Sequence, residues 1–148
     1  MKSKRLVQIG ENHERGISVT LYLLDQALCE FEQWAQGRQV RSVLYEVRNT
    51  LSVEQRRRIL DEIAHMRQIL VEIRDALALE GNIKSVVRVI TAQCAVLWVH
   101  LVELEGKRLL RYGEPPLELA NYLDPKVGDL IERLKNIADI VSGEPLDK

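Results

Sequence analysis

The spacing of the apolar residues limits the fold of this chain more than any other feature of its sequence. Apolar side chains recur at alternating steps of three and four residues, which places them on one side of an α-helix. The clearest stripe lies within residues 53–79 and consists of Ile59, Ile63, Met66, Leu70, Ile73 and Leu77. No segment shows the sustained alternation of apolar and polar residues that is typical of strands. The sequence therefore predicts an all-α fold.

Capping residues and glycines divide this pattern into separate helices. The first helix is expected over about residues 14–49, with a bend at Gly37, because the apolar stripe changes phase after this glycine. The second helix is expected to begin at Ser52, which forms a capping-box pattern with Gln55 three residues later. Gly81 is its expected stop.

The second half of the chain predicts three more helical segments. A third helix is expected to begin near residue 83, to carry Lys107, Arg108 and Arg111 in its last turn, and to end at Gly113. Two adjacent prolines then force a turn. A short extra helix is expected over residues 117–123. The Asp-Pro pair at 124–125 resembles an N-cap followed by proline in the first turn, so the last helix is predicted to begin there and to end at Gly143.

Short connections favour antiparallel neighbours in a helical protein. We therefore expect an antiparallel four-helix bundle with a long, bent first helix and a short extra helix before the last one. We expect a single domain over residues 1–148, with residues 1–12 as a candidate flexible arm.

The third helix is apolar on two opposite sides. Its main stripe includes Ile90, Cys94 and Leu97, and a second stripe lies roughly 160° away at about 100° per residue. An outer helix of a simple bundle buries one face only. We expect the second face to meet the displaced half of the first helix, a second copy of the chain, or a lipid or small molecule. The residues that we assign to an interface are Val89, Ala92, Val96, Trp98 and Val99.

Charge and composition exclude several classes of function. The 21 basic and 22 acidic side chains give a net charge of −1, and aromatic residues make up only 5%, so no nucleic-acid partner is expected. The most apolar stretch, residues 86–104, carries Arg88, His100 and Glu103, so no membrane partner is expected. Two cysteines are too few for a disulfide framework and indicate a cytoplasmic location.

Candidate catalytic and metal-ligating residues are sparse. Glu62 and His65 match the Glu-x-x-His pattern of di-iron helical bundles, but the sequence lacks the second copy that such a site needs. Glu72 and Asp75 form an acidic motif, and Asp75 falls opposite the apolar stripe, as expected for surface charges. We assign no catalytic, cofactor-binding or metal-binding residue.

These observations predict a non-enzymatic protein-interaction or assembly module that acts through helix–helix contacts, most simply as a homodimer, with another protein as a further candidate partner. A metal-binding or enzymatic bundle that uses Glu, Asp and His side chains is the alternative. A third hypothesis is a regulatory domain that binds a partner helix in a groove.

Overall fold

The computed structural model describes residues 5–143 and contains four helices, which confirms the all-α prediction. In chain order they are α1 (Glu11–Ala35), α2 (Val53–Leu77), α3 (Val86–Val102) and α4 (Leu117–Ser142). Helix α1 packs against α2, and α3 packs against α4. The chain divides into two compact units, residues 1–82 and residues 83–148. The single domain over residues 1–148 stays a prediction.

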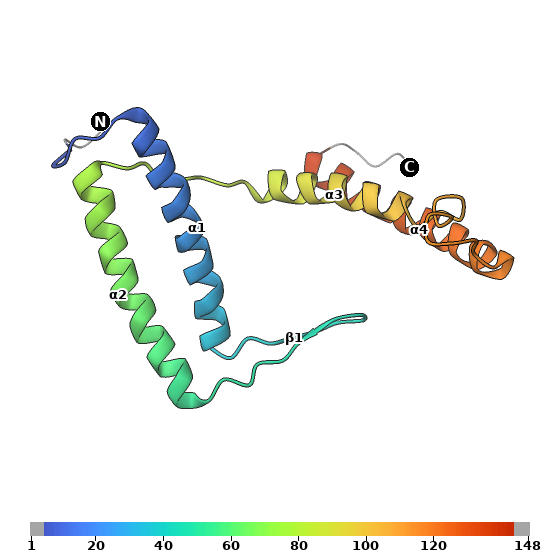
Figure 1. Ribbon diagram of the computed structural model, residues 1–148, viewed down its shortest axis with the longest axis horizontal. Coiled ribbons are helices and arrows are strands. Elements are labelled where there is room, and N and C mark those ends of the chain that lie inside the picture. The colour runs from blue at the N-terminus through green and yellow to red at the C-terminus, as the bar shows by residue number, and fades with distance from the viewer. Residues whose placement is uncertain (1–4, 144–148) are drawn as a thin grey trace. The chain divides into compact units, whose positions relative to one another are not determined.

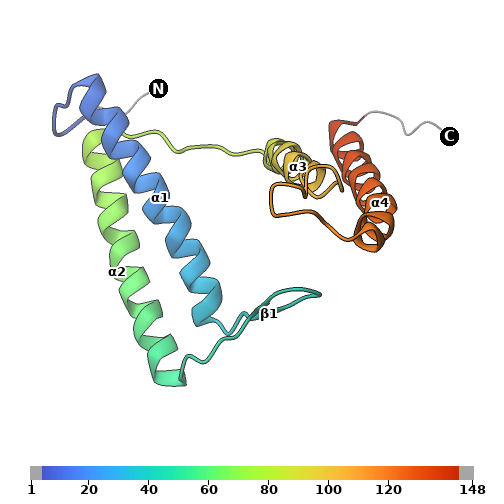
Figure 2. The same ribbon diagram turned by 45° about the vertical axis from the view of Figure 1, so that its right-hand side comes forward.

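The first unit is an antiparallel pair of helices, α1 and α2 (Figures 1 and 2). Its buried apolar residues are Leu28 and Ala35 from α1 and Ile63 from α2. Arg67 of α2 also reaches Glu32 of α1, with 2.5 Å between Nη1 and Oε2. Two helices alone can cover only one face of each other, so the buried contact between α1 and α2 is narrow.

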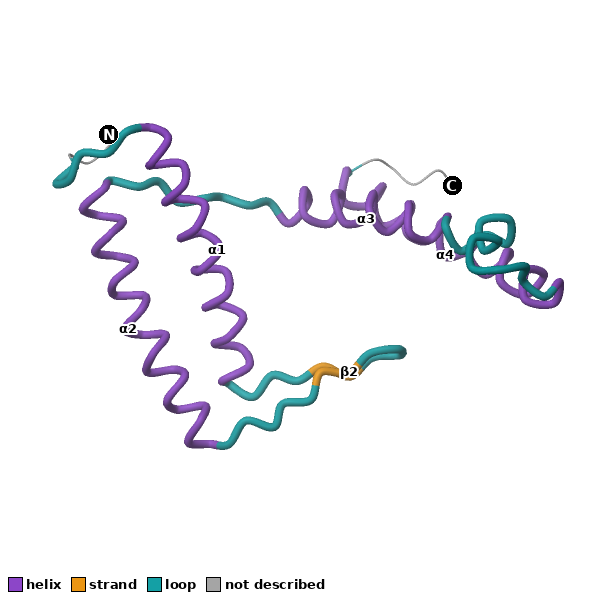
Figure 3. The backbone as a smooth tube through the Cα atoms, viewed as in Figure 1, coloured by secondary structure: helices purple, strands orange, loops and turns teal. Residues whose placement is uncertain are grey.

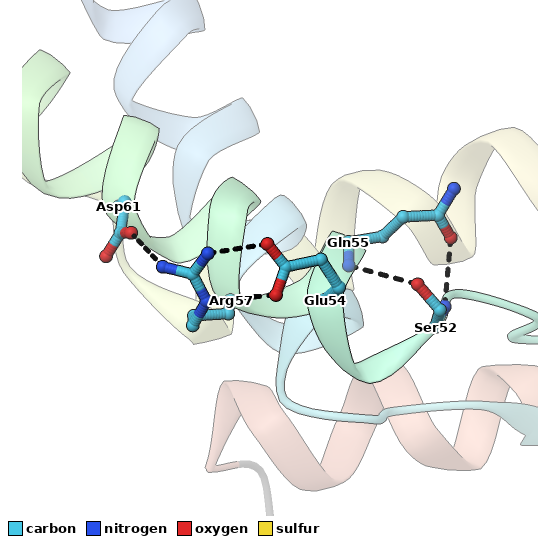
Figure 4. Close-up of polar contacts among 5 residues, drawn as sticks. All are labelled: Ser52, Glu54, Gln55, Arg57 and Asp61. Carbon is cyan, nitrogen blue, oxygen red and sulfur yellow. Dashed lines mark hydrogen bonds and ion pairs between the residues drawn. The ribbon is translucent and has the colours of Figure 1, made fainter.

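The start of α2 confirms the predicted capping box. The Gln55 backbone N–H donates to the Ser52 hydroxyl at 3.1 Å, and the Ser52 N–H donates to the Gln55 side chain at 2.9 Å (Figure 4). One turn further along, the Arg57 guanidinium contacts Glu54 and Asp61 at 2.6 and 3.2 Å. The capping box satisfies the backbone N–H groups of Ser52 and Gln55 at the start of the helix, so this start can be predicted from the sequence.

The end of α2 differs from the prediction. The helix ends at Leu77 and not at Gly81, with Ala78 in the left-handed conformation at a φ of 51°. The backbone N–H groups of Leu6 and Val7 donate to the Ala76 carbonyl at 2.8 and 3.1 Å. Residues 6 and 7, which precede α1 in the chain, thus supply donors to a carbonyl in the last turn of α2, and α2 ends one residue later.

The expected flexible arm, residues 1–12, falls into three parts. Residues 1–4 lie outside the described residues. Arg5 forms a 2.6 Å ion pair with Glu14, and Leu6 and Val7 make the two backbone contacts with α2. The last residues of the expected arm belong to α1, which begins at Glu11.

The long, bent first helix is wrong, because α1 ends at Ala35. A small antiparallel hairpin of β1 (Val40–Arg41) and β2 (Glu46–Val47) replaces the second half of the expected helix (Figure 3, orange). Gly37 has a φ of 99°, which turns the chain out of the helix. The Asn49 side chain then donates to the carbonyls of Trp34 and Arg38, both at 2.7 Å. It thereby adds a second donor to the Trp34 carbonyl, which also accepts the Gly37 N–H at 3.0 Å, and supplies a donor to the Arg38 carbonyl just past the helix end.

The second unit is the pair of α3 and α4, and its buried apolar residues are Cys94 and Val127. The predicted end of the third helix at Gly113 is wrong, because α3 ends at Val102 and the chain continues in tighter turns, in which the Leu104 N–H donates to the Leu101 carbonyl at 3.0 Å. The separate short helix over residues 117–123 is wrong, because α4 continues through Pro125. Asp124 does not act as the predicted N-cap, since its carboxylate accepts the Gly106 backbone N–H at 2.8 Å. Pro125 then removes one hydrogen bond from α4 without ending the helix.

Candidate interaction surface

Helix α3 leaves most of its apolar side chains uncovered within the structure. Cys94 is its only buried residue, and it lies on the main stripe, as predicted for a small core residue. Val87 and Leu97 belong to the same stripe and are still 46% and 47% exposed. Because α4 is the one helix that packs against α3 in this unit, the burial of α3 is confined to a short contact.

All five residues assigned to an interface from the sequence are exposed. Val96 is 57% exposed, Trp98 and Val99 are 51% exposed, and Val89 and Ala92 fall in the same exposed class. The second apolar face of α3 therefore exists as a surface of the unit. The displaced half of the first helix was one candidate to cover it, but that helix is absent, since residues 40–47 form the hairpin instead.

Helix α4 also carries apolar residues that its packing on α3 does not bury. They are Leu117, Leu119, Tyr122, Leu130, Ile137 and Ile140, each at least 41% exposed. Single exposed apolar residues are ordinary on a protein surface, whereas a run of them along both helices of a pair is typical of an interaction surface.

The polar residues weighed as catalytic or metal-ligating candidates do not converge. Glu62, His65, Glu72 and Asp75 are all exposed on α2. His65 contacts only the backbone of its own helix, with Nδ1 2.9 Å from the Asp61 carbonyl. Within residues 5–143, no three His, Cys, Asp or Glu side chains gather as a metal site requires. The geometry therefore identifies no group of described residues that would support the metal-binding alternative.

A groove of about 390 Å³ lies in the first unit beside α1 and α2. Its lining includes Tyr22, Leu70 and two cations, Arg67 and Arg74. Arg67 holds the pKa of Glu32 below its ordinary value of 4.5 by donating hydrogen bonds to that carboxylate. Arg74 is likewise paired, with the carboxylate that follows it in the chain. Both arginines are thus already paired with carboxylates, and neither is left as an unpaired positive charge for an anionic ligand.

Both cysteines are free thiols, one in each unit. Cys29 is exposed, and its sulfur lies 3.9 Å from the Arg67 guanidinium, a neighbour from α2 that the sequence did not indicate. Within the described residues, none of the helices combines the length and the hydropathy that are needed to cross a membrane.

The hairpin is the surface feature that the sequence analysis missed. Residues 40–47 contain three valines and a tyrosine, which favour strands, but the spacing of Val40, Leu44 and Val47 also fits a helix. Gly37 and Asn49, which bracket the segment, were the available signals for a chain reversal.

Comparisons with known proteins give no further identification. No protein-family model, no curated protein sequence and no solved structure matches this chain.

Proposed function

We propose that this protein is a non-enzymatic assembly module that self-associates through helix–helix contacts of α3. The surface that we assign to the contact is the α3 face, defined by Val89, Ala92, Val96 and Val99, together with Trp98, which flanks the main stripe of the helix. The observation that carries the proposal is the exposure of this apolar face, which α4 leaves open.

The residue types of the α3 face suit contact with another helix. Valine and alanine are small, so they allow two helices to approach closely, and their steps of three and four follow one side of α3. Trp98 lies beside the main stripe of α3 and is 51% exposed, and tryptophans are frequent anchors of interfaces. A second copy presents the same face, so a two-fold symmetric dimer is the simplest closed assembly.

Both free thiols support a reducing environment. We therefore place the proposed dimer in the cytoplasm.

Light scattering of the full chain at tens of micromolar tests the proposal. We expect twice the 17.0 kDa mass of the chain for the wild type, and a monomer for Val96→Glu, because a buried carboxylate at the contact has no partner. Ile69→Glu is the matched control, since Ile69 on α2 is 54% exposed against 57% for Val96 and lies outside the α3 face. Circular dichroism checks that both variants keep their helices. A wild-type monomer, or a dimer that Val96→Glu leaves intact, contradicts the proposal.

A further inference from the structure

The hairpin ends in Val43 and Leu44, the two most exposed large apolar residues among the described residues of the first unit. We call residues 36–51 the arm and Val43, Leu44 and Tyr45 its tip. Val43 and Leu44 are 93% and 96% exposed, and Tyr45 is 61% exposed. The arm extends away from the ends of α1 and α2 between which it lies in the chain (Figures 1 and 2).

The tip lacks the residues that tight turns favour. Two-residue hairpin turns are usually built from glycine, asparagine or aspartate, which accept a positive φ and are well solvated. Here Val43 and Leu44 occupy the turn, and neither has a positive φ. Turn formation therefore does not explain the apolar side chains at the tip, and a role in contact with another molecule would explain them.

The arm is held in place by specific hydrogen bonds. The Ser42 N–H donates to the Tyr45 carbonyl at 2.9 Å across the turn, and Val40 pairs with Val47 behind it. At the base, the Asn49 amide bonds two carbonyls at the end of α1. These contacts present the tip in a defined direction.

Positive charge lies behind the tip of the arm. Residues 36–51 contain three arginines and one acidic residue, whereas the whole chain has a net charge of −1. Arg41 belongs to β1 and pairs across the hairpin with Glu46, Arg48 directly follows β2, and both arginines are exposed. Arg48 lies 3.4 Å from Glu46, while Arg41 makes no ion pair within the described residues. The arm is thus apolar at its end and basic behind it.

We propose that the arm docks the protein on anionic lipid bilayers by inserting its tip into the interfacial layer. Apolar side chains enter the boundary of headgroups and acyl chains, a tyrosine suits the interface, and arginines attract anionic headgroups. One apolar anchor alone gives marginal binding, so the arginines behind the tip provide the second attraction.

The size of the tip favours a bilayer over a protein partner. A stable protein interface takes about 20–30 residues from each side, whereas the tip offers three. A narrow convex tip needs a matching pocket in a folded partner, but a fluid interfacial layer adapts to it. The expectation of no membrane partner rested on segments that could cross the bilayer, and the arm reaches only its surface.

Flotation of the full chain with vesicles tests this docking. We expect wild-type protein to float with vesicles of phosphatidylserine and phosphatidylcholine, and much less with phosphatidylcholine alone. Leu44→Ser should lower the partition coefficient at least tenfold, because it removes a leucine that would be buried in the layer. Arg41→Gln should lower it about fivefold on the anionic vesicles only.

Leu6→Ser is the matched control, since Leu6 is 82% exposed and contacts the opposite end of α2 through its backbone. It should bind vesicles like the wild type. The absence of flotation at millimolar lipid, or flotation that Leu44→Ser leaves unchanged, overturns the proposal. Binding to a DNA duplex that is lost in Leu44→Ser, with no vesicle binding, assigns the arm to nucleic acid and overturns it as well. A change from dimer to monomer in Leu44→Ser without vesicle binding assigns the tip to a second copy.

Discussion

Replacing Asn49 with alanine measures how strongly one side chain holds the arm to the first unit. The Asn49 amide donates to the Trp34 and Arg38 carbonyls at 2.7 Å, and its oxygen accepts the Leu51 N–H at 3.2 Å. The contacts with Trp34 and Leu51 are partly buried, while the contact with Arg38 is exposed. Water can replace only the exposed one at little cost.

Two partly buried hydrogen bonds at about 1 kcal/mol each give a loss of about 2 kcal/mol for Asn49→Ala. With a urea dependence of roughly 1.5 kcal/mol per M, the midpoint of unfolding of the first unit should fall by about 1 M or slightly more. Asn49→Asp should lose about half of this stability, since a carboxylate still accepts the Leu51 N–H but cannot donate to the Trp34 carbonyl.

Urea unfolding followed by tryptophan fluorescence gives the measurement. Each unit holds one tryptophan, so a Trp98→Phe background leaves Trp34 as the reporter of the first unit. Asn12→Ala is the control, because Asn12 is an exposed asparagine in the first turn of α1. A midpoint for Asn49→Ala within about 0.3 M of the control, equivalent to less than about 0.5 kcal/mol, refutes the reasoning that this side chain fixes the arm.

Two further predictions concern packing and pH. Gly106→Ala should destabilise the second unit by about 1–3 kcal/mol in urea unfolding, because the added Cβ would lie 2.9 Å from the Ala120 Cβ. Gly128→Ala, where the added Cβ meets nothing within 4 Å, should instead leave the midpoint unchanged or raise it. Since the pKa of Glu32 is lowered by its hydrogen bonds with Arg67, its stabilisation is present above pH 4.5 and is lost as the pH falls through the lower native pKa. Glu32→Gln should therefore be less stable than the wild type at neutral pH, and unfolding midpoints measured down the acid range should converge; a gap that stays constant contradicts this account.

The helices could be predicted because their signals are local. The stripe that contains Ile63 predicted the buried side of α2, and Ile63 is the buried residue of that helix. Ser52 and Gln55 predicted the start of α2 through contacts three residues apart. The exposed α3 face was also identifiable, since the second stripe exceeds what one neighbouring helix can cover.

The hairpin could not be predicted because its sequence is compatible with two structures. Val40, Leu44 and Val47 fit one side of a helix, while the same segment is rich in residues that favour strands. The contact of Asn49 with Trp34, which lie 15 residues apart, decides between them in the structure. Periodicity within a short window carries no information about such a contact.

The sequence by itself determined that this chain forms helices, where α2 begins and that α3 has a second apolar face, because each depends on residues within a few positions of one another. Tertiary structure decided where α1 and α2 end and that α4 runs through Pro125. These outcomes depend on the pairs Asn49–Trp34, Leu6–Ala76 and Gly106–Asp124, which are distant in sequence. The physical reason is that a helix end is stable where its free carbonyl or N–H groups find partners, and those partners come from other parts of the fold.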